Sequence, residues 1–207
     1  MTQISWDSDT FSINHSPVYL RGVAKHEDSN IRGRGLDLPL VTRDFNLMKW
    51  LGGNVFRTSH YPYAEEILDF ADRFGILVIS ECPGVNLEGF AEELRINHEA
   101  VMDELVARDK NHASVVMWSI GNEPRSENPL ARDYFQSVAD HTRALDPTRP
   151  ITLVVDRGFD TDQGSYAVDI ISINRFAHVF TFFKYYNITK QKLLIVPQIL
   201  RLVRGHW

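Results

Sequence analysis

The sequence predicts an α/β protein of the (β/α)8 barrel type that is incomplete, with about six strand–helix units. Segments of strand and helix character alternate along most of the 207 residues, which is typical of parallel strands joined by helices. Polar residues follow the ends of several successive strands, as they do at the mouth of a barrel. A complete barrel of this kind has eight strands and typically about 250 residues, so we expect about two units to be missing. An open doubly wound sheet is the alternative, but no glycine-rich phosphate turn follows the first predicted strand.

The first predicted elements follow from hydrophobic periodicity and from glycine at segment ends. Residues 18–23 read as a strand and are followed by a loop that reaches Pro39. Apolar residues at helical spacing predict a helix over 41–51, which Gly52 and Gly53 end. A strand over 54–58 and a helix over 64–74 come next, and Gly75 ends this helix in turn.

The remaining elements continue the same alternation. A short buried strand over 76–80 precedes a helix over 98–109, and a near-continuous apolar run over 115–120 reads as a strand buried on both faces. A helix over 130–145 closes with Asp146-Pro147, and two further strands are expected over 151–155 and 168–173.

Composition and charge exclude several classes of protein. The chain has a net charge of −5 and is 43% hydrophobic, which describes a globular protein with one sizeable core. The mild acidity gives no reason to expect nucleic acid or an anionic membrane surface as a partner, and no apolar run reaches transmembrane length. Cys82 is the only cysteine, so no internal disulfide is expected. The polar and acidic residues 1–10 are unlike a signal peptide.

The strand over 115–120 runs into Gly121-Asn122-Glu123-Pro124, where glycine and proline halt regular pairing. Two polar side chains are thereby left at the carboxyl end of a buried strand, which is where α/β sheets keep their chemistry. Apolar neighbours favour the neutral form of a carboxyl group, so Glu123 is a candidate proton donor. The alternative is that Glu123 and Pro124 simply begin the next loop.

Other strand ends carry polar groups of the same kind. These ends are Lys25-His26-Glu27-Asp28, Arg57-Thr58-Ser59-His60-Tyr61-Pro62, Ser80-Glu81-Cys82-Pro83 and Asn174. A barrel would bring all of them to one rim, where they could bind a ring of hydroxyl groups. Arg57, or Arg32 and Arg34, could meet an anionic group there.

Each of these residues also has a structural interpretation. His26 and His60 can be hydrogen-bonded structural histidines, and Asp28 can be a turn residue. Arg57 can be the partner of Glu81 in an internal ion pair, because buried charges are common in structural networks. A metal site is not expected, since His26 with Asp28, and His60 with Glu81, lack a recognised ligand spacing.

Several long motifs resemble the β-glucuronidases of glycoside hydrolase family 2, in the same order along the chain. The motifs span residues 21–28, 56–66, 108–112, 116–124 and 145–152. The resemblance covers roughly residues 17–174 and implies a TIM-barrel catalytic domain, which in the family is normally preceded by two β-sandwich domains. It also implies a retaining exo-hydrolase of β-D-glucuronides that needs no cofactor.

The resemblance assigns roles residue by residue. Glu123 corresponds to the general acid/base, and Asn122 would bond the sugar hydroxyl next to the reacting carbon. His26, Asp28 and His60 fall at strand ends that line the sugar pocket in the family. Asn174 matches an asparagine on the sixth strand, where the family continues Asn-x-Tyr-Tyr.

The chain departs from the family after Asn174. Phe176 stands at the tyrosine position, which removes a hydroxyl. In the family the seventh strand ends in Ser/Thr-Glu-Tyr-Gly, whose glutamate is the nucleophile, whereas this chain has no glutamate after Glu127. Residues 193–196 could occupy a strand, but Pro197-Gln198 follows where the carboxylate belongs, and a carboxamide is a poor nucleophile. We therefore expect a partial catalytic domain over 1–176 and a divergent tail over 177–207.

The expected function is that of a β-glucuronidase-type glycoside hydrolase with the acid/base present and the nucleophile missing. The alternative is a catalytically silent sugar-binding or regulatory fragment. A β-D-glucuronide or related glycoside is the expected ligand, and the open barrel allows homo-oligomerisation or association with a full-length subunit. Animal relatives are lysosomal and bacterial ones cytoplasmic, so the resemblance leaves the compartment open.

Overall fold

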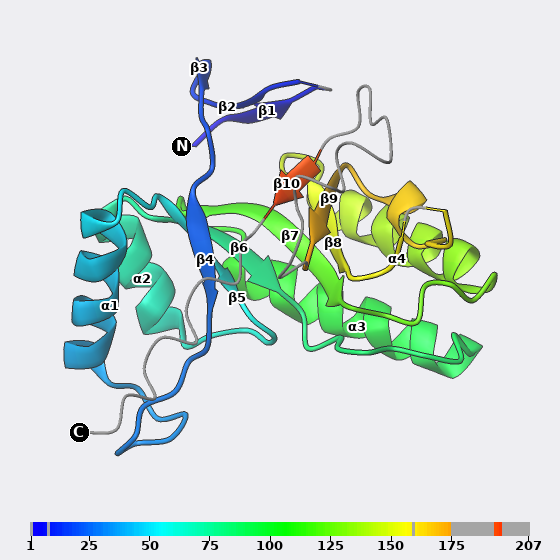
Figure 1. The fold of residues 1–207 in the computed structure, drawn as a ribbon, viewed down its shortest axis with the longest axis horizontal. Helices are drawn as coiled ribbons and strands as arrows, with labels where there is room; N and C mark the ends of the chain where they lie inside the picture. Colours follow the sequence, from blue (N-terminus) through cyan, green and yellow to red (C-terminus); the bar gives the residue numbers. More distant parts are fainter. Residues whose placement is uncertain (1, 8, 159, 175–192, 196–207) are drawn as a thin grey trace.

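The computed structural model describes residues 2–7, 9–158, 160–174 and 193–195 (Figure 1). Its centre is a sheet of seven strands in the order β10-β9-β8-β7-β6-β5-β4. All neighbouring pairs in this sheet are parallel. The strands are β4 (Gly22–Lys25), β5 (Val55–Thr58), β6 (Leu77–Glu81), β7 (Val115–Asn122), β8 (Ile151–Val155), β9 (Ile170–Ile173) and β10 (Leu193–Ile195).

This topology is that of a (β/α) barrel that does not close within the described residues. Strand order follows chain order without a switch, as in a barrel and unlike a doubly wound sheet. β4 and β10 are the two edges of the described sheet. The predicted incomplete barrel is therefore confirmed.

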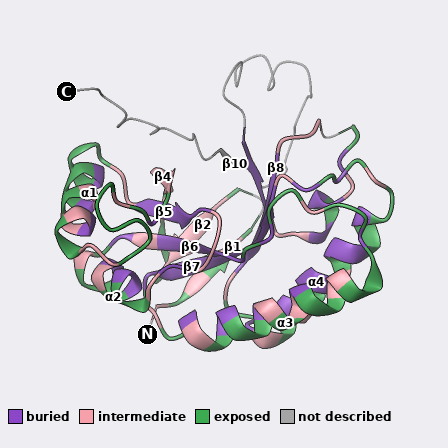
Figure 2. Cartoon of the chain, turned by 90° about the horizontal axis from the view of Figure 1, so that it is seen from below, coloured by how far each residue is buried: buried purple, intermediate pink, exposed green. Residues whose placement is uncertain are grey.

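Helices connect the strands and lie along the outside of the curved sheet (Figure 2). They are α1 (Leu38–Trp50), α2 (Glu65–Phe74), α3 (Glu92–Asp109), α4 (Ala131–Leu145) and the short 3-10 helix η1 (Ser165–Ala167). β5 to β9 are almost wholly buried, whereas each α-helix is buried on one side. Apolar side chains such as Phe56, Trp118 and Leu153 join the helices in one core. None of the helices in the described part is long and apolar enough to cross a membrane.

Two helices begin three or more residues before the predicted start. α1 begins at Leu38 instead of residue 41, because the Asp37 side chain accepts a hydrogen bond from the Leu40 N–H and caps the helix, and Pro39 is tolerated in a first turn. α3 begins at Glu92 instead of residue 98. Its buried residues all lie from His98 onward, and in its first turns Leu94 alone packs, partly buried, against the core, so these turns carry no strong apolar pattern.

The first predicted strand was partly wrong, and a small sheet was missed. β4 covers 22–25 and not 18–23, while residues 4–17 form an antiparallel sheet of β1 (Ile4–Trp6), β2 (Phe11–Ile13) and β3 (Ser16–Pro17). Phe11 packs with Val55, Ile79 and other residues in a second apolar cluster. Most residues of this cluster lie in the amino-terminal halves of the strands, away from the polar residues at the carboxyl ends.

Candidate active site

A bulge in β7 places the Asn122 side chain on the inner face of the curved sheet, where the side chains of Arg57 and Glu81 lie. Ser119 pairs with Thr152 and Asn122 with Val154, so β7 has one residue more than β8 between these pairs. Because side chains alternate along a strand, the extra residue turns Asn122 to the same face as Ser119. Gly121 permits this with φ 156°, where a Cβ would lie 3.2 Å from the Gly84 carbonyl oxygen.

A buried ion pair forms the floor of the site. Arg57 Nη1 donates to Glu81 Oε2 at 2.5 Å and to Asn122 Oδ1 at 3.1 Å. His60 Nδ1 lies 2.8 Å from Glu81 Oε1, and Ser119 Oγ donates to Oε2 at 2.7 Å. The side chains of Arg57 and Glu81 are both fully buried. The structural interpretation of Arg57, as the internal partner of Glu81, is therefore what the structure shows.

The protonation of Glu81 follows from these contacts. Burial by itself would raise the pKa of Glu81, but the charge of Arg57 and the hydrogen bonds from His60, Ser119 and Arg57 together hold this pKa below its usual value. Glu81 is thus an anion whose oxygens are both occupied. An occupied and inaccessible carboxylate is a poor candidate for a nucleophile.

Glu123 lies at the open end of the same network. Its carboxylate is half-buried, and Oε1 accepts a hydrogen bond of 2.7 Å from Asn174 Nδ2. The same Nδ2 donates to Asn122 Oδ1 at 2.9 Å, so one amide ties the two residues together. Within the described residues Glu123 Oε2 and Asn122 Nδ2 have no hydrogen-bond partner, which leaves an acceptor and a donor for a ligand. The polar neighbour of Glu123 is an amide, where the sequence suggested apolar surroundings.

The backbone holds Glu123 in an uncommon conformation. Its φ is 49°, in the left-handed region, and its N–H donates to the Val154 carbonyl oxygen at 2.7 Å. Non-glycine residues in this region cost of order 1 kcal/mol or more and cluster at functional sites. The hydrogen bond to β8 helps to fix the residue there.

Orphan polar atoms mark the space beside this network. Arg57 Nε and Nη2 and Asn174 Oδ1 are buried without a hydrogen-bond partner in the described part of the chain. Buried polar atoms are normally satisfied by protein or by water. Each is a point where a water or a ligand hydroxyl would complete the hydrogen bonding.

The other predicted residues occupy the outer side of the site. His26 is exposed, and its ring meets that of His60 edge-on with centroids 5.5 Å apart. Tyr61, which the sequence placed at the same strand end without a role of its own, has its hydroxyl 3.4 Å from His26 Nδ1. Its position directly after His60 was the available signal. Asp28 is exposed and forms no hydrogen bond with any described residue, and His26 reaches the other predicted residues only through its ring contact with His60.

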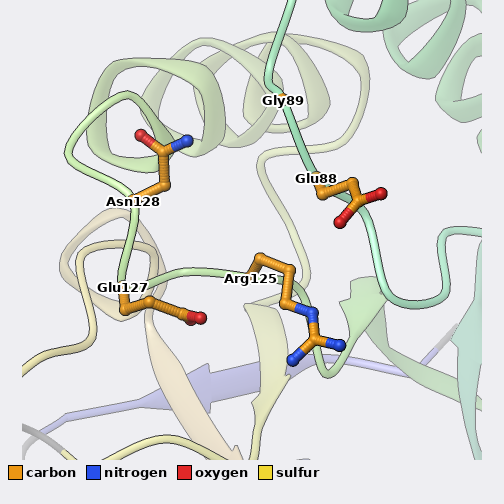
Figure 3. Close-up of a pocket in the computed structure, with 5 residues that line it drawn as sticks. All are labelled: Glu88, Gly89, Arg125, Glu127 and Asn128. Atoms are coloured by element: carbon orange, nitrogen blue, oxygen red, sulfur yellow. The ribbon is translucent and has the colours of Figure 1, made fainter.

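A groove of about 620 Å³ opens next to the site on the loops after β6 and β7 (Figure 3). It is lined by Glu88, Gly89, Arg125, Glu127 and Asn128. In Figure 3 the Arg125 side chain lies between those of Glu88 and Glu127. The groove does not include Asn122, Glu123 or Asn174, so the site is defined by its hydrogen bonds and not by this depression.

One group of side chains has the composition of a metal site, but it lies elsewhere. Asp69 and Asp72 of α2 and His112 place potential ligand atoms within 4.8 Å of one another. His112 precedes β7, so the group is at the amino ends of the strands, opposite the candidate site. Asp72 already accepts from the Ser114 N–H at 2.7 Å and contacts His112 Nδ1 at 2.9 Å, which accounts for it structurally.

The chain is similar to known proteins in sequence. The family model described as glycosyl hydrolases family 2, TIM barrel domain, matches residues 4–196. The β-glucuronidase of Rattus norvegicus is 55% identical over 169 residues, which cover 80% of this chain and 26% of the rat protein.

Two solved structures are similar in fold and sequence. The Bifidobacterium dentium β-glucuronidase complexed with coumarin-3-O-glucuronide gives a TM-score of 0.88 at 34% identity and covers 95% of this chain and 36% of that one. The Ruminococcus gnavus β-glucuronidase in complex with D-glucaro-d-lactam gives 0.81 at 39% identity, over 85% and 31%. The chain thus spans only about a quarter to a third of the length of these relatives. A match over nearly the whole described barrel means that the chain belongs to glycosyl hydrolase family 2, as part of its TIM barrel domain.

Proposed function

We propose that this chain carries the acid/base half of a retaining β-glucuronidase site, with Glu123 as the proton donor and acceptor. The observation that carries the proposal is the 2.7 Å hydrogen bond from Asn174 Nδ2 to Glu123 Oε1, with Asn122 on the same amide. It unites three residues from two strand ends into one polar group. The glucuronide-type ligands named for the Bifidobacterium and Ruminococcus relatives support a β-D-glucuronide as the substrate.

Each residue has a role that its surroundings allow. Glu123 Oε2 carries the proton to the glycosidic oxygen, since the other carboxylate oxygen is held by Asn174. Asn122 Nδ2 donates to a sugar hydroxyl, because Oδ1 is already held by Arg57 and Asn174. His26, His60 and Asp28 line the outer side of the sugar pocket.

The nucleophile is the missing half. Retaining hydrolysis uses two carboxyl groups about 5–5.5 Å apart, one as acid/base and one as nucleophile. No glutamate follows Glu127 in the sequence, and both oxygens of Glu81 are engaged. We accordingly propose that the family-like part of the chain ends near residue 176 and that a divergent tail follows. The residues on which the sequence analysis based this boundary, Phe176, Pro197 and Gln198, lie outside the described residues.

The experiment compares the full chain with Glu123→Gln on two aryl β-D-glucuronides. Phenol is a poor leaving group that needs protonation, whereas 4-nitrophenol leaves with little help. Loss of a general acid should therefore lower kcat/KM by about 100-fold or more on the phenyl substrate, and by less on the nitrophenyl substrate. The control is Glu104→Gln, an exposed glutamate of α3. Measurable turnover by the wild type with an equal kcat/KM for Glu123→Gln on both substrates would contradict the proposal.

A second candidate function is a catalytically silent sugar-binding fragment, alone or in association with itself or a full-length subunit. The occupied state of Glu81 and the lack of a later glutamate favour it. Titration calorimetry with D-glucaro-d-lactam separates the two. Binding of the lactam by a wild-type chain that releases neither phenol would establish the silent binder.

A further inference from the structure

Helix α1 has two flanks, and in the described part of the chain a neighbouring helix covers one of them. On that flank Phe45 packs on Phe70 and Phe74 of α2, with ring centroids 5.5 and 5.9 Å away. Lys49 Nζ lies 4.9 Å from the centroid of the Phe74 ring on the same side. Figure 1 shows α1 at the edge of the molecule, beside α2. The other flank of α1 therefore lies without a covering helix among the described residues.

This second flank is rich in leucine. Residues at i, i+4, i+7 and i+11 form a stripe along one side of a helix, because successive residues are about 100° apart. One such stripe lies about 150° around the axis of α1 from Phe45 and Lys49. We call it the α1 seam, and it consists of Leu40, Asp44, Leu47 and the C-cap residue Leu51. Leu47 is 40% exposed and Leu51 is 55% exposed, although this spacing is typical of a helix that packs on another helix.

The one charged residue of the α1 seam is neutralised within the chain. Asp44 Oδ2 lies 3.6 Å from Lys25 Nζ of β4, and Asp44 Oδ1 accepts a hydrogen bond of 3.3 Å from Arg43 Nη2. Like charges that face each other across an interface are costly. Because Asp44 is already paired, two copies of the seam can meet without that repulsion.

Strand β4, which supplies Lys25 to this ion pair, is an edge of the central sheet. Within the described residues it pairs with β5 alone, from Gly22 opposite Val55 to Lys25 opposite Thr58. All four residues of β4 are half-buried, whereas those of β5 are fully buried. The free edge of a strand presents N–H and C=O groups to which another strand can add. The open edge and the α1 seam therefore lie on the same side of the molecule.

A second copy of the chain can cover the edge and the seam together. Rotation about a two-fold axis perpendicular to the sheet pairs β4 with β4 of the second copy in antiparallel direction, which is the commoner kind of strand pair. The same rotation places both α1 helices on one face of the joined sheet, with Leu40 opposite Leu51 of the second copy. An isologous contact uses the same patch on both subunits, so no other partner is required.

We propose that the edge of β4 and the α1 seam form a two-fold interface between two copies of this chain. The dimer joins the two central sheets into one through the paired β4 strands. In a closed barrel each strand is paired on both sides, so this contact is available only to an open barrel. The interface includes none of Asn122, Glu123 and Asn174, and the inference is therefore independent of the proposed function.

The test measures the mass of the full chain by sedimentation equilibrium between about 1 and 100 μM, where the weaker interfaces of standard size associate. We expect the wild type to reach twice its chain mass of 23.8 kDa. Leu47→Glu places a carboxylate near the two-fold axis on both copies and should raise the dissociation constant of the dimer by about 30-fold or more. Leu51→Glu, at the end of the seam, should raise it by less. Circular dichroism verifies that each variant keeps the secondary structure of the wild type.

The matched control is Ile96→Glu on α3, which makes the same kind of change at a residue that is also 55% exposed. Its dissociation constant should stay within about twofold of the wild type. A wild-type chain that is monomeric throughout would overturn the inference. So would a polymer longer than a dimer, since a two-fold contact closes after two copies. A dimer that resists both Leu47→Glu and Leu51→Glu, or that Ile96→Glu weakens equally, would also overturn it.

Hydrogen exchange tests the strand part of the interface. Pairing of β4 with its copy should slow the exchange of β4 amides as the concentration of the chain rises through the dissociation constant. The amides of β7, in the middle of the sheet, should exchange at the same rate in the monomer and the dimer. An exchange rate of β4 that does not change with dimer formation would overturn the pairing of the two edges.

Discussion

Glu81 and Glu123 stand at the carboxyl ends of neighbouring strands, β6 and β7, yet their surroundings differ. Glu81 is fully buried and bonded by Arg57, His60 and Ser119. Glu123 is half-buried, and the bond from Asn174 is the one its carboxylate makes within the described residues. Both are glutamates at the carboxyl end of a strand, so the difference in role comes from their burial, their backbone conformation and their hydrogen-bond partners.

The comparison explains how the site is built. The Glu81 carboxylate matches the Arg57 charge, and Arg57 in turn fixes the Asn122 side chain. A site that must position groups within a fraction of an ångström needs such support behind them. The buried ion pair of Arg57 and Glu81 stabilises the fold at this point, so Glu123 Oε2 is not needed for a structural hydrogen bond and can contact a ligand.

The largest effect is expected when the supporting carboxylate is removed. Glu81→Gln leaves the buried Arg57 without an opposing charge, which typically lowers the free energy of unfolding by about 3–5 kcal/mol. Urea denaturation followed by circular dichroism measures the loss. In the control Glu104→Gln, on the exposed side of α3, the change should stay within about 0.5 kcal/mol. A Glu81→Gln variant as stable as the control would remove the distinction between the two glutamates.

The pH dependence of stability sharpens the comparison further. The folded-state pKa of Glu81 is held below the ordinary 4.5, so its contribution is complete above pH 4.5 and is lost as the pH falls through the lower folded value. Burial lowers the pKa of His98 from 6.5 to about 4. The unfolded chain therefore takes up a proton between pH 6.5 and 4 that the folded chain refuses, at a cost of about 3 kcal/mol.

The urea concentration at the midpoint of unfolding, measured at pH values between 8 and 3, distinguishes the contribution of His98 from that of Glu81. His98→Gln should flatten the fall between pH 6.5 and 4, and Glu81→Gln should flatten the fall below pH 4.5. A wild-type chain whose midpoint does not change from pH 6.5 to 4 would contradict the assignment to His98.

The smallest effects concern the open end of the site. Glu123→Gln keeps an acceptor for Asn174, so the free energy of unfolding should change by less than about 1 kcal/mol. Asn174→Leu removes the donor to both Asn122 and Glu123 and should cost about 1–3 kcal/mol. Urea denaturation of Glu123→Gln and Asn174→Leu measures which of the two variants loses more free energy of unfolding. A Glu123→Gln loss as large as that of Glu81→Gln would show that Glu123 is also structural.

Much of the scaffold was accessible from the sequence. The strand over 151–155 is β8 to the residue, and the helix over 64–74 differs from α2 by one position, because buried apolar runs and terminal glycines are strong local signals. Parallel strands align their carboxyl ends, so Asn122, Glu123 and Asn174 could be expected to meet. The exposed start of α3 and the small sheet before β4 escaped because neither has a strong local pattern.

The sequence by itself determined the order of the strands, the helices between them and the polar residues that close each strand, since these depend on local periodicity and on parallel topology. Only the tertiary structure decided which polar residues pair. The bulge at Gly121 that turns Asn122 inward, the occupation of Glu81 by Arg57, and the stack of Arg34 on Tyr61 all depend on contacts between segments far apart in the chain. Such contacts are set by packing in three dimensions, and no local pattern encodes them.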